Sequence, residues 1–308
     1  MTDRCNLRCL YCMPEEGVDL IPKEEVLTFE EITRLTDLFV RMGVNKVRLT
    51  GGEPTIRRGF ETLVKELVLL PGLDSLCLTT NGLRLEEYAC QLAQSGLKGV
   101  NVSLDTLRPD RFEQITRRPG LDKVLAGIEA ALKAGLQTKI NVVVLPGHND
   151  DEVLDFALLA ESRELEVRFI EFMPFLQNKW SRGQVISSAQ IRARLMERLP
   201  LEPAPSAADD VARRWTLPGW GGSVGFISSV TESFCDGCSR VRLTADGQFK
   251  TCLFLPSCLD LKKLLRSDAD DDQISQAVRD ALMTKWPGHP PMINWRQLDT
   301  LSMVQIGG

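Results

Sequence analysis

The chain has 308 residues, with 37 lysines and arginines, 42 aspartates and glutamates, nine cysteines and two histidines. Its composition predicts a soluble globular protein, and its net charge of −5 argues against bulk attraction to nucleic acid or to a membrane. The two histidines disfavour a His-rich zinc site or a Ser-His-Asp triad. No apolar stretch is long enough to span a bilayer or to form a secretory signal, so we expect a cytoplasmic protein.

The first motif in the chain is a group of three cysteines. Cys5, Cys9 and Cys12 follow the spacing Cys-x3-Cys-x2-Cys. Three soft thiolates at this spacing can bind three irons of a cubane cluster and leave the fourth iron for another ligand. A structural zinc site normally has a fourth protein ligand, and the segment offers none. The spacing therefore favours an iron–sulfur cluster over zinc.

Short β-branched segments then alternate with helical ones over the first two thirds of the chain. Thr28 and Glu31 form a capping box that begins the first helix, and Gly43 ends it. The other expected helices are 59–70, 85–95, 121–134 and 150–162. The expected strands are 46–50, 75–79, 98–103, 138–144 and 166–171. Strands separated by helices form right-handed βαβ units, so the pattern predicts a parallel sheet.

Three of these strands end in polar and glycine residues. The ends are 50–53 (Thr-Gly-Gly-Glu), 79–82 (Thr-Thr-Asn-Gly) and 103–105 (Ser-Leu-Asp). Turn chemistry alone explains any one of them. Together they point to a ligand site, because parallel sheets bind ligands at the carboxyl ends of their strands.

The composition changes near residue 200. Pro200, Pro203 and Pro205 indicate a linker or an extended excursion. Strand-like pieces follow at 223–230 and 241–244, and a helix is expected at about 270–286.

A second group of three cysteines lies in this part of the chain. Cys235, Cys238 and Cys252 follow the spacing Cys-x2-Cys-x13-Cys. With Cys258 as a fourth ligand they could form an incomplete zinc ribbon. Beside a first iron–sulfur cluster, a second cluster with an open iron is the better interpretation. Of the remaining cysteines, Cys77 and Cys90 are expected to pack as small hydrophobic side chains.

The first cysteine group, with aromatic Tyr11 before its last cysteine, resembles the signature of radical S-adenosylmethionine (SAM) enzymes. Gly51-Gly52-Glu53-Pro54 resembles the GGEP segment of the same superfamily. The resemblance implies a [4Fe–4S] cluster on three cysteines, with SAM on the fourth iron. It also implies that SAM is cleaved to a 5′-deoxyadenosyl radical, which abstracts hydrogen.

The second cysteine group and its neighbours closely resemble the C-terminal motif of the GTP 3′,8-cyclase family of molybdenum cofactor biosynthesis. Cys238-Ser-Arg240-Val241-Arg242 leads into Cys252, and the chain ends in Gly307-Gly308. Further similar segments are 2–6, 48–54, 78–82, 101–105, 139–143 and 168–173. The resemblance therefore runs from residue 2 to residue 308.

This resemblance implies a fold, a reaction and cofactors. The implied fold is α/β, an incomplete parallel (β/α) TIM-type barrel at 1–220, with a C-terminal iron–sulfur-binding extension at 221–308. The implied reaction converts GTP to 3′,8-cyclo-7,8-dihydro-GTP with two [4Fe–4S] clusters and SAM. The implied SAM-binding residues are Tyr11, Gly52, Glu53, Ser103 and Met173. The implied GTP-binding residues are Arg48, Thr79, Lys139, Arg240, Val241 and Arg242, with weaker support for Lys46, Arg168, Gly307 and Gly308.

A triphosphate also requires cations, which an acidic protein must gather locally. Lys46 and Arg48 lie two apart on an expected strand and therefore share a face, as Arg240 and Arg242 do beside the second cysteine group. Lys139 and Arg168 complete a basic ring. An isolated arginine is more often a solvated surface charge, so the case rests on the group.

The resemblance has one gap. In the family, a first barrel strand and a GTP-contacting arginine precede the Thr-Asp-Arg-Cys segment, which begins here at Thr2. We therefore expect an exposed edge on the barrel and one phosphate contact fewer, with lower stability and activity than an extended chain.

The resemblance also implies partners. These are a low-potential, flavodoxin-like electron donor, the next pathway enzyme (cyclic pyranopterin monophosphate synthase) and a second copy in a homodimer. Two alternatives stay open at this point. A peptide-modifying radical SAM enzyme with an auxiliary cluster would not need Arg240 and Arg242, and a zinc-binding interaction module would not need the GGEP segment.

Overall fold

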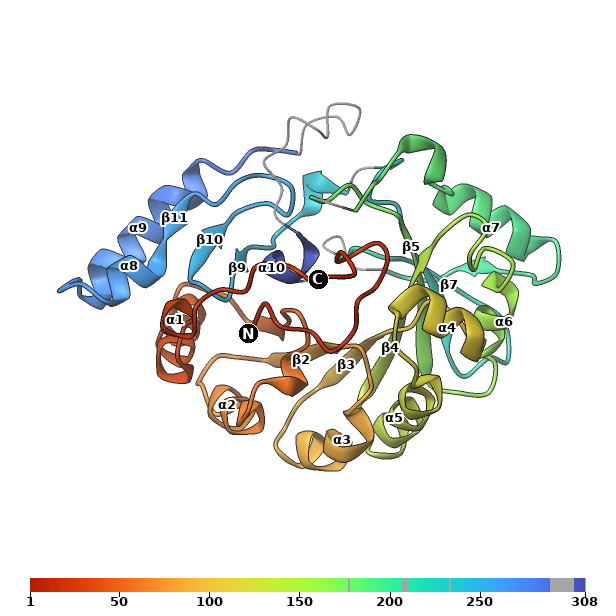
Figure 1. Ribbon diagram of the computed structural model, residues 1–308, viewed down its shortest axis with the longest axis horizontal. Helices are drawn as coiled ribbons and strands as arrows, with labels where there is room; N and C mark the ends of the chain where they lie inside the picture. Colours follow the sequence, from red (N-terminus) through yellow and green to blue (C-terminus); the bar gives the residue numbers. More distant parts are fainter. Residues whose placement is uncertain (177, 207–209, 233, 289–301, 308) are drawn as a thin grey trace.

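The protein is an α/β structure built around one large curved sheet (Figure 1). The computed structural model describes residues 1–308 except 177, 207–209, 233, 289–301 and 308. The sheet has eight strands in the order β1-β2-β3-β4-β5-β8-β7-β6. Those strands are β1 (Lys46–Leu49), β2 (Ser75–Thr80), β3 (Gly99–Ser103), β4 (Gln137–Val144), β5 (Leu165–Glu171), β6 (Glu202–Pro203), β7 (Arg213–Thr216) and β8 (Ser223–Ile227).

Strands β1 to β5 and β8 run parallel, while β7 and β6 are antiparallel additions. Helices cover the outside of the sheet and leave its inner face toward the middle of the ring (Figure 1). They are α1 (Phe29–Arg41), α2 (Phe60–Leu67), α3 (Leu85–Gln94), α4 (Pro109–Thr116), α5 (Leu121–Lys133), α6 (Val153–Leu158) and α7 (Ser188–Met196). The incomplete parallel barrel predicted from the sequence is confirmed, since strands and helices alternate around an open ring.

Alternation along the strands separates a hydrophobic outer face from a polar inner face. On β4, Ile140 and Val142 are each 1% exposed and belong to the core under the helices. Lys139 and Asn141 alternate with them and point the other way. Register aligns Thr79, Asn101, Lys139 and Glu166 in one row across four strands. Alternation along the strands therefore makes the inner face polar, which is typical of a ligand-binding site and not of a packed core.

The first helix and the first strand follow the sequence prediction. Thr28 and Glu31 form the capping box at the start of α1. Strand β1 forms one edge of the sheet, because among the described strands it pairs with β2 alone.

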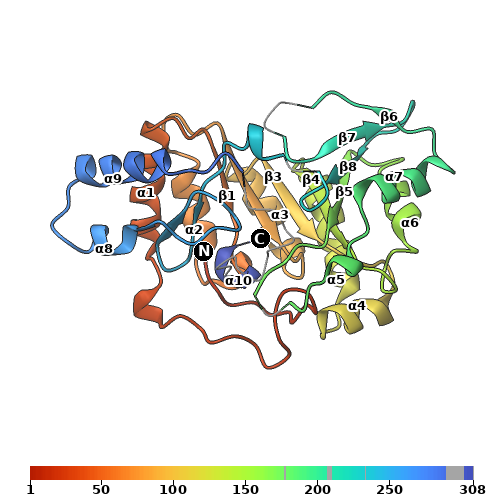
Figure 2. The same ribbon diagram turned by 90° about the horizontal axis from the view of Figure 1, so that it is seen from above.

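A C-terminal extension follows the main sheet, and two of its helices lie beside α1 (Figure 2). The extension comprises β9 (Arg242–Leu243), β10 (Gln248–Lys250), β11 (Leu259–Asp260), α8 (Leu261–Leu265), α9 (Asp271–Met283) and α10 (Met303–Ile306). Figure 2 shows α8 and α9 beside α1, where Arg34 and Arg41 form ion pairs with Asp271 at 2.7 and 2.9 Å. Exposed pairs contribute little, so the buried contact of Phe249 with Phe39 (5.8 Å between ring centres) stabilises the docking more.

The observed elements differ from the predicted ones at several places. The helix expected from residue 150 begins only at Val153, because Asp150 and Glu152 accept hydrogen bonds from loop backbone. Helices α4, α7, α8 and α10 and strands β6, β7, β10 and β11 were not predicted. Cys77 is buried as predicted, but Cys90 is exposed, so its predicted packing is wrong. Strand β8 adds residues 223–227 to the main sheet, and the domain boundary at 220 stays a prediction.

Within the described part of the chain, no helix has the length and apolar character that crossing a membrane requires.

Candidate active site

The segment that carries Cys5, Cys9 and Cys12 is fixed at its start and in its middle by backbone hydrogen bonds. Before the cysteines, the Gly52 and Glu53 amides donate to the Thr2 and Arg4 carbonyls at 2.6 and 2.8 Å. Between them, the Arg8 and Leu10 amides donate to carbonyls at the end of α4, both at 2.9 Å. The segment thus spans from the end of β1 to the end of α4, at the carboxyl ends of the strands.

Gly51 and Gly52 permit the close approach of this segment. A Cβ at Gly51 would lie 2.4 Å from the Thr2 carbonyl oxygen, and one at Gly52 would lie 2.1 Å from the Arg4 carbonyl oxygen. Gly51 also has a φ of +153°. Only glycine fits such contacts without a shift of backbone, which explains two residues of the GGEP segment physically.

Gly52→Ala is expected to displace the cysteine segment and to destabilise the fold by about 1–3 kcal/mol, because the added methyl group overlaps fixed backbone. Iron content after anaerobic reconstitution and urea unfolding measure the effect. Gly183→Ala is the matched control, since no atom of the described residues lies within 4 Å of a Cβ there. Equal iron content in the two variants would contradict this explanation.

Burial controls the protonation of the three thiols. Burial, then the neighbouring Cys5 and Asp105, raises the pKa of Cys12 to about 12, and burial raises the pKa of Cys5 and Cys9 too. Such thiols need a bound cation to become thiolates. Among the described residues, no three Cys, His, Asp or Glu side chains are grouped closely enough for one metal ion. A cubane cluster does not require three ligands on one metal ion, because each thiolate binds a separate iron. The three cysteine thiols therefore suit a cubane cluster.

The Glu53 carboxylate forms hydrogen bonds that hold neighbouring loop and strand ends together. It is 1% exposed, and its carboxylate accepts hydrogen bonds from the Thr55 amide and hydroxyl, the Thr80 hydroxyl and the Asn81 amide at 2.6–3.0 Å. Asn81 in turn donates to the Asn6 side chain at 2.8 Å, next to Cys5. Glu53 therefore positions the cysteine segment, and the predicted contact of its carboxylate with SAM would have to replace one of these donors.

Tyr11 is anchored to the buried carboxylate of Asp105, which lies in a strand end that the sequence marked as polar but to which it gave no role. Its hydroxyl donates to Asp105 at 2.6 Å, and the other Asp105 oxygen accepts from the Val143 amide at 2.8 Å. Asp105 directly follows β3, so this pair connects the cysteine segment to the ends of β3 and β4.

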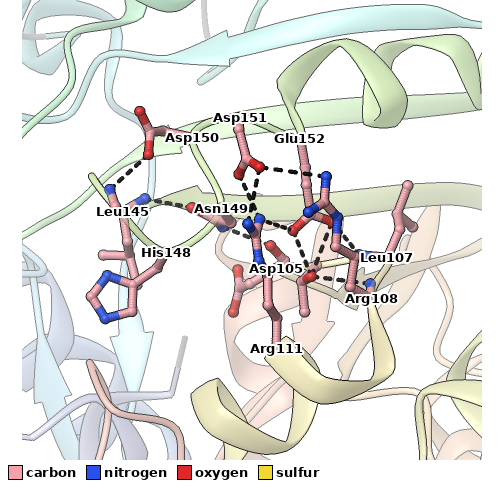
Figure 3. Close-up of polar contacts among 12 residues, drawn as sticks. Asp105, Leu107, Arg108, Arg111, Leu145, His148, Asn149, Asp150, Asp151 and Glu152 are labelled. Carbon is pink, nitrogen blue, oxygen red and sulfur yellow. Dashed lines mark hydrogen bonds and ion pairs between the residues drawn. The ribbon is translucent and has the colours of Figure 1, made fainter.

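A polar network holds the Asp105 segment in place (Figure 3). The Asn149 amide donates to the Asp105 carbonyl at 2.6 Å and to the Val143 carbonyl at 2.9 Å. The fully buried Glu152 accepts from the Leu107 amide at 2.7 Å and forms an ion pair with Arg111 at 2.8 Å. These bonds fix the backbone on both sides of Asp105, so Tyr11 has a rigid partner.

Asp105 predicts a pH dependence of stability. Burial, opposed in part by Tyr11 and Val143, raises its pKa from 3.8 to about 6. The folded state therefore holds a proton that the unfolded state loses, and stability falls as the pH rises through this interval. We expect Asp105→Asn to gain up to about 3 kcal/mol relative to the unchanged chain between about pH 4 and pH 7. Urea unfolding of the cluster-free chain measures this, and a constant difference across the range would contradict it.

The inner face gathers the predicted cations. Burial lowers the pKa of Arg48, and the nearby Arg168 and Arg240 lower it further. Burial and Arg168 lower the pKa of Lys139, and the exposed Lys46 adds to this effect. These shifts show that the cations from β1, β4, β5 and the extension lie close enough to repel one another. The Arg48 Nη1 is buried and has no hydrogen-bond partner within the described part of the chain, so the site has a donor available for an anion.

Sequence reasoning missed the acid within this ring. Glu166 on β5 is 6% exposed and lies beside Lys139 and Arg168. Its position two residues before Arg168 was the available signal, since both side chains share a face. A single acidic residue in a strand is otherwise unremarkable, so the signal was weak.

Cys235, Cys238 and Cys252 line a cavity of about 60 Å³. Met173, Arg240, Val241 and Arg242 line it too. The Arg242 Nε is buried, and no described residue forms a hydrogen bond with it. Burial, together with Arg240, lowers the pKa of Arg242 to about 10. Burial would raise the pKa of the Cys238 thiol, but Arg240 outweighs it and lowers that pKa. The cavity thus combines thiols with cations, as an iron–sulfur cluster and an anionic substrate require.

The remaining predicted residues lie at the ends of strands β2 and β3 and in the C-terminal tail. Thr79 and Ser103 are half-buried on the inner ends of β2 and β3. A Cβ at Gly307 would lie 2.4 Å from the Thr50 hydroxyl, so the tail after α10 reaches the end of β1. Gly308 lies outside the described residues.

The comparisons with known proteins match this arrangement. Residues 1–160 match the family described as the Radical SAM superfamily, and residues 165–291 match the one described as Molybdenum Cofactor Synthesis C. The chain is 44% identical over 310 residues to "GTP 3′,8-cyclase, mitochondrial" of Arabidopsis thaliana, covering 100% of this chain and 80% of that protein. The chain belongs to the GTP 3′,8-cyclase family.

Other members of the family span different lengths. The chain is 45% identical to the GTP 3′,8-cyclase of Moorella thermoacetica, covering all of this chain and 95% of that protein. It is also 45% identical to molybdenum cofactor biosynthesis protein 1 of Mus musculus, of which it spans only 49%.

The fold also resembles that of a solved structure. SuiB of Streptococcus suis bound to S-adenosylmethionine superposes with a TM-score of 0.58 at 16% identity, over 87% of this chain and 64% of that chain. Membership of the superfamily assigns SAM and an iron–sulfur cluster as cofactors. The zinc-binding module and the peptide-modifying enzyme are both disfavoured by the cyclase relatives.

Proposed function

We propose that this protein is a radical SAM GTP 3′,8-cyclase, which converts GTP to 3′,8-cyclo-7,8-dihydro-GTP in molybdenum cofactor biosynthesis. The observation that carries the proposal is a pair of buried nitrogens, Arg48 Nη1 and Arg242 Nε, which have no hydrogen-bond partner among the residues that the structure describes. A buried arginine nitrogen without a partner is costly and calls for an anionic ligand. Its placement beside cysteines and a basic ring fits a nucleoside triphosphate.

The first cysteine group would hold the cluster that binds SAM. When bound, this cluster and SAM supply the electron and the carbon-centred oxidant that removes hydrogen from ribose C3′. Tyr11, Gly52, Glu53, Ser103 and Met173 would line the SAM pocket. Tyr11 is held by Asp105 and Gly52 by its contact with Arg4, so the chain orients this pocket in advance.

The second cysteine group would hold a second [4Fe–4S] cluster with an open iron toward the guanine edge. Arg240, Val241 and Arg242 line the same cavity and would bind the substrate beside it. Arg48, Thr79 and Lys139, with Lys46 and Arg168, would hold the triphosphate by charge-assisted hydrogen bonds.

The C-terminal tail would help to exclude water. Ile306 packs with Phe175 and Phe254, on which Met173 and Cys252 also pack. Gly307 lies against Thr50. Exclusion of water from the site would prevent side reactions of a radical intermediate, which would give Gly307 a role near the substrate.

Anaerobic reconstitution tests the proposed function. We expect about eight irons per chain, SAM cleavage that GTP stimulates above the basal reductant-driven rate, and a cyclised nucleotide isomeric with GTP and detected by mass spectrometry after chemical conversion. Zinc without iron, or SAM cleavage that GTP does not influence, would overturn the proposal. The proposed partners are a low-potential electron donor, cyclic pyranopterin monophosphate synthase and a second copy of the chain, and the proposed location is the cytoplasm.

A further inference from the structure

Glu166 lies at the centre of the basic inner face. Its carboxylate accepts two hydrogen bonds from Arg168, at 2.8 and 3.0 Å, and lies 3.1 Å from the Lys139 ammonium. Register places Lys139 directly opposite Glu166 on the neighbouring strand. One buried carboxylate is therefore shared by two cations that come from β4 and β5.

The backbone of β8 confines this carboxylate. A Cβ at Gly225 would lie 2.9 Å from the Glu166 Oε1 and 3.3 Å from the Arg168 Cγ. Gly225 thus leaves just enough room for the Glu166–Arg168 pair against β8, and the carboxylate cannot move away in that direction.

The ionised state of Glu166 depends on the two cations beside it. Burial would raise the pKa of Glu166, but Arg168 and Lys139 outweigh it and hold the pKa below its ordinary value. Glu166 is thus ionised at neutral pH and screens Lys139 and Arg168 from each other and from Arg48. A polyphosphate that approaches the same cations must compete with this carboxylate.

We propose that Glu166 is the internal counter-ion of the polyphosphate site: it neutralises Lys139 and Arg168 while the site is empty, and phosphate oxygens take over at least one of these cations on binding. The inference rests on the proposed function only in placing a polyphosphate at these cations. Glu166 is a positioning residue, because it keeps two like charges together until the ligand replaces it.

The test uses Glu166→Gln in the full, anaerobically reconstituted chain, with inorganic tripolyphosphate as the probe. The amide keeps the shape and loses the charge. We expect tripolyphosphate to bind on the order of tenfold more tightly by calorimetry, because one opposing charge is gone. The free variant should melt at a lower temperature, because two buried cations lose their counter-ion, and tripolyphosphate should raise its melting temperature more than that of the unchanged chain. A merely structural role would weaken binding as it weakens the fold.

Glu129→Gln is the matched control, because Glu129 also pairs with an arginine, Arg163 at 3.0 Å, but on the exposed surface. It should change neither binding nor melting. Should Glu166→Gln fail to fold, the comparison of Lys139→Gln with the charge-balanced Lys139→Gln/Glu166→Gln pair carries the same contrast, and the double variant should bind tripolyphosphate more tightly.

Unchanged or weaker binding on removal of the Glu166 charge would overturn the inference. That result would leave the proposed function standing, since GTP-dependent cyclisation by the unchanged chain is measured separately. If the unchanged chain did not cyclise GTP, but removal of the Glu166 charge still tightened the binding of tripolyphosphate, the proposed function would fail and the inference would stand.

Discussion

Arg48→Met is expected to give a more stable protein that binds GTP at least about a hundredfold more weakly, a loss of about 2.7 kcal/mol. Arg48 Nη1 is buried and has no hydrogen-bond partner in the described ranges, and burial lowers the pKa of the guanidinium. A methionine of similar length fills the same space without an unpaired charge, so the free energy of unfolding should rise by about 1–2 kcal/mol. The same change removes the cation that the phosphates require.

Urea unfolding and GTP titration of the same preparations measure the two effects of Arg48→Met. Arg279→Met on the exposed face of α9 is the matched control and should alter neither quantity. A variant that is less stable and binds GTP normally would show that Arg48 supports the fold instead of the substrate.

Cys252→Ser is expected to lower the iron content from about eight to about four per chain and to abolish cyclisation, while reductant-driven SAM cleavage persists. Cys9→Ser should abolish both reactions, because the first cysteine group would hold the cluster that binds SAM. The two variants therefore separate the roles of the two cysteine groups. Iron analysis, SAM cleavage and product formation are measured side by side.

Two other cysteines serve as controls for this experiment. Cys90 and Cys258 are both exposed, and serine at either position should leave iron and activity unchanged. Loss of metal from the second group on Cys258→Ser would favour the zinc ribbon, and full iron content in Cys252→Ser would contradict a second cluster.

Much of the barrel was predictable because local signals agreed with the fold. The β-branched runs became β1 to β5 within one or two residues, and the Thr28–Glu31 capping box begins α1 as expected. Prediction failed where tertiary contacts decide an element. Helix α6 starts late because the Glu152 carboxylate bonds to Leu107, 45 residues earlier in the chain.

The residues of the site also fall into those that local sequence signals predicted and those that tertiary contacts decide. Motif spacing singled out the six cysteines, and strand periodicity placed Lys46 and Arg48 on one face. Asp105, Asn81 and Glu166 were not assigned a role, because each acts through a partner distant in sequence. Glu53 was assigned a contact with SAM, yet its carboxylate is occupied by four donors from the ends of β1 and β2.

The sequence alone determined which chemistry this protein can support, because thiol spacing, the paired glycines and the cation pairs along strands are set by covalent distance and by the two-residue period of a strand. It could not determine which charges face one another. Parallel strands bring residues together through register and curvature, and these depend on packing over the whole sheet. Only the tertiary structure therefore decided that Glu166 lies between Lys139 and Arg168, and that nitrogens of Arg48 and Arg242 are buried without partners among the described residues. The nine cysteines and two histidines indicated the class of chemistry, and the fold decided where the substrate's charge can go.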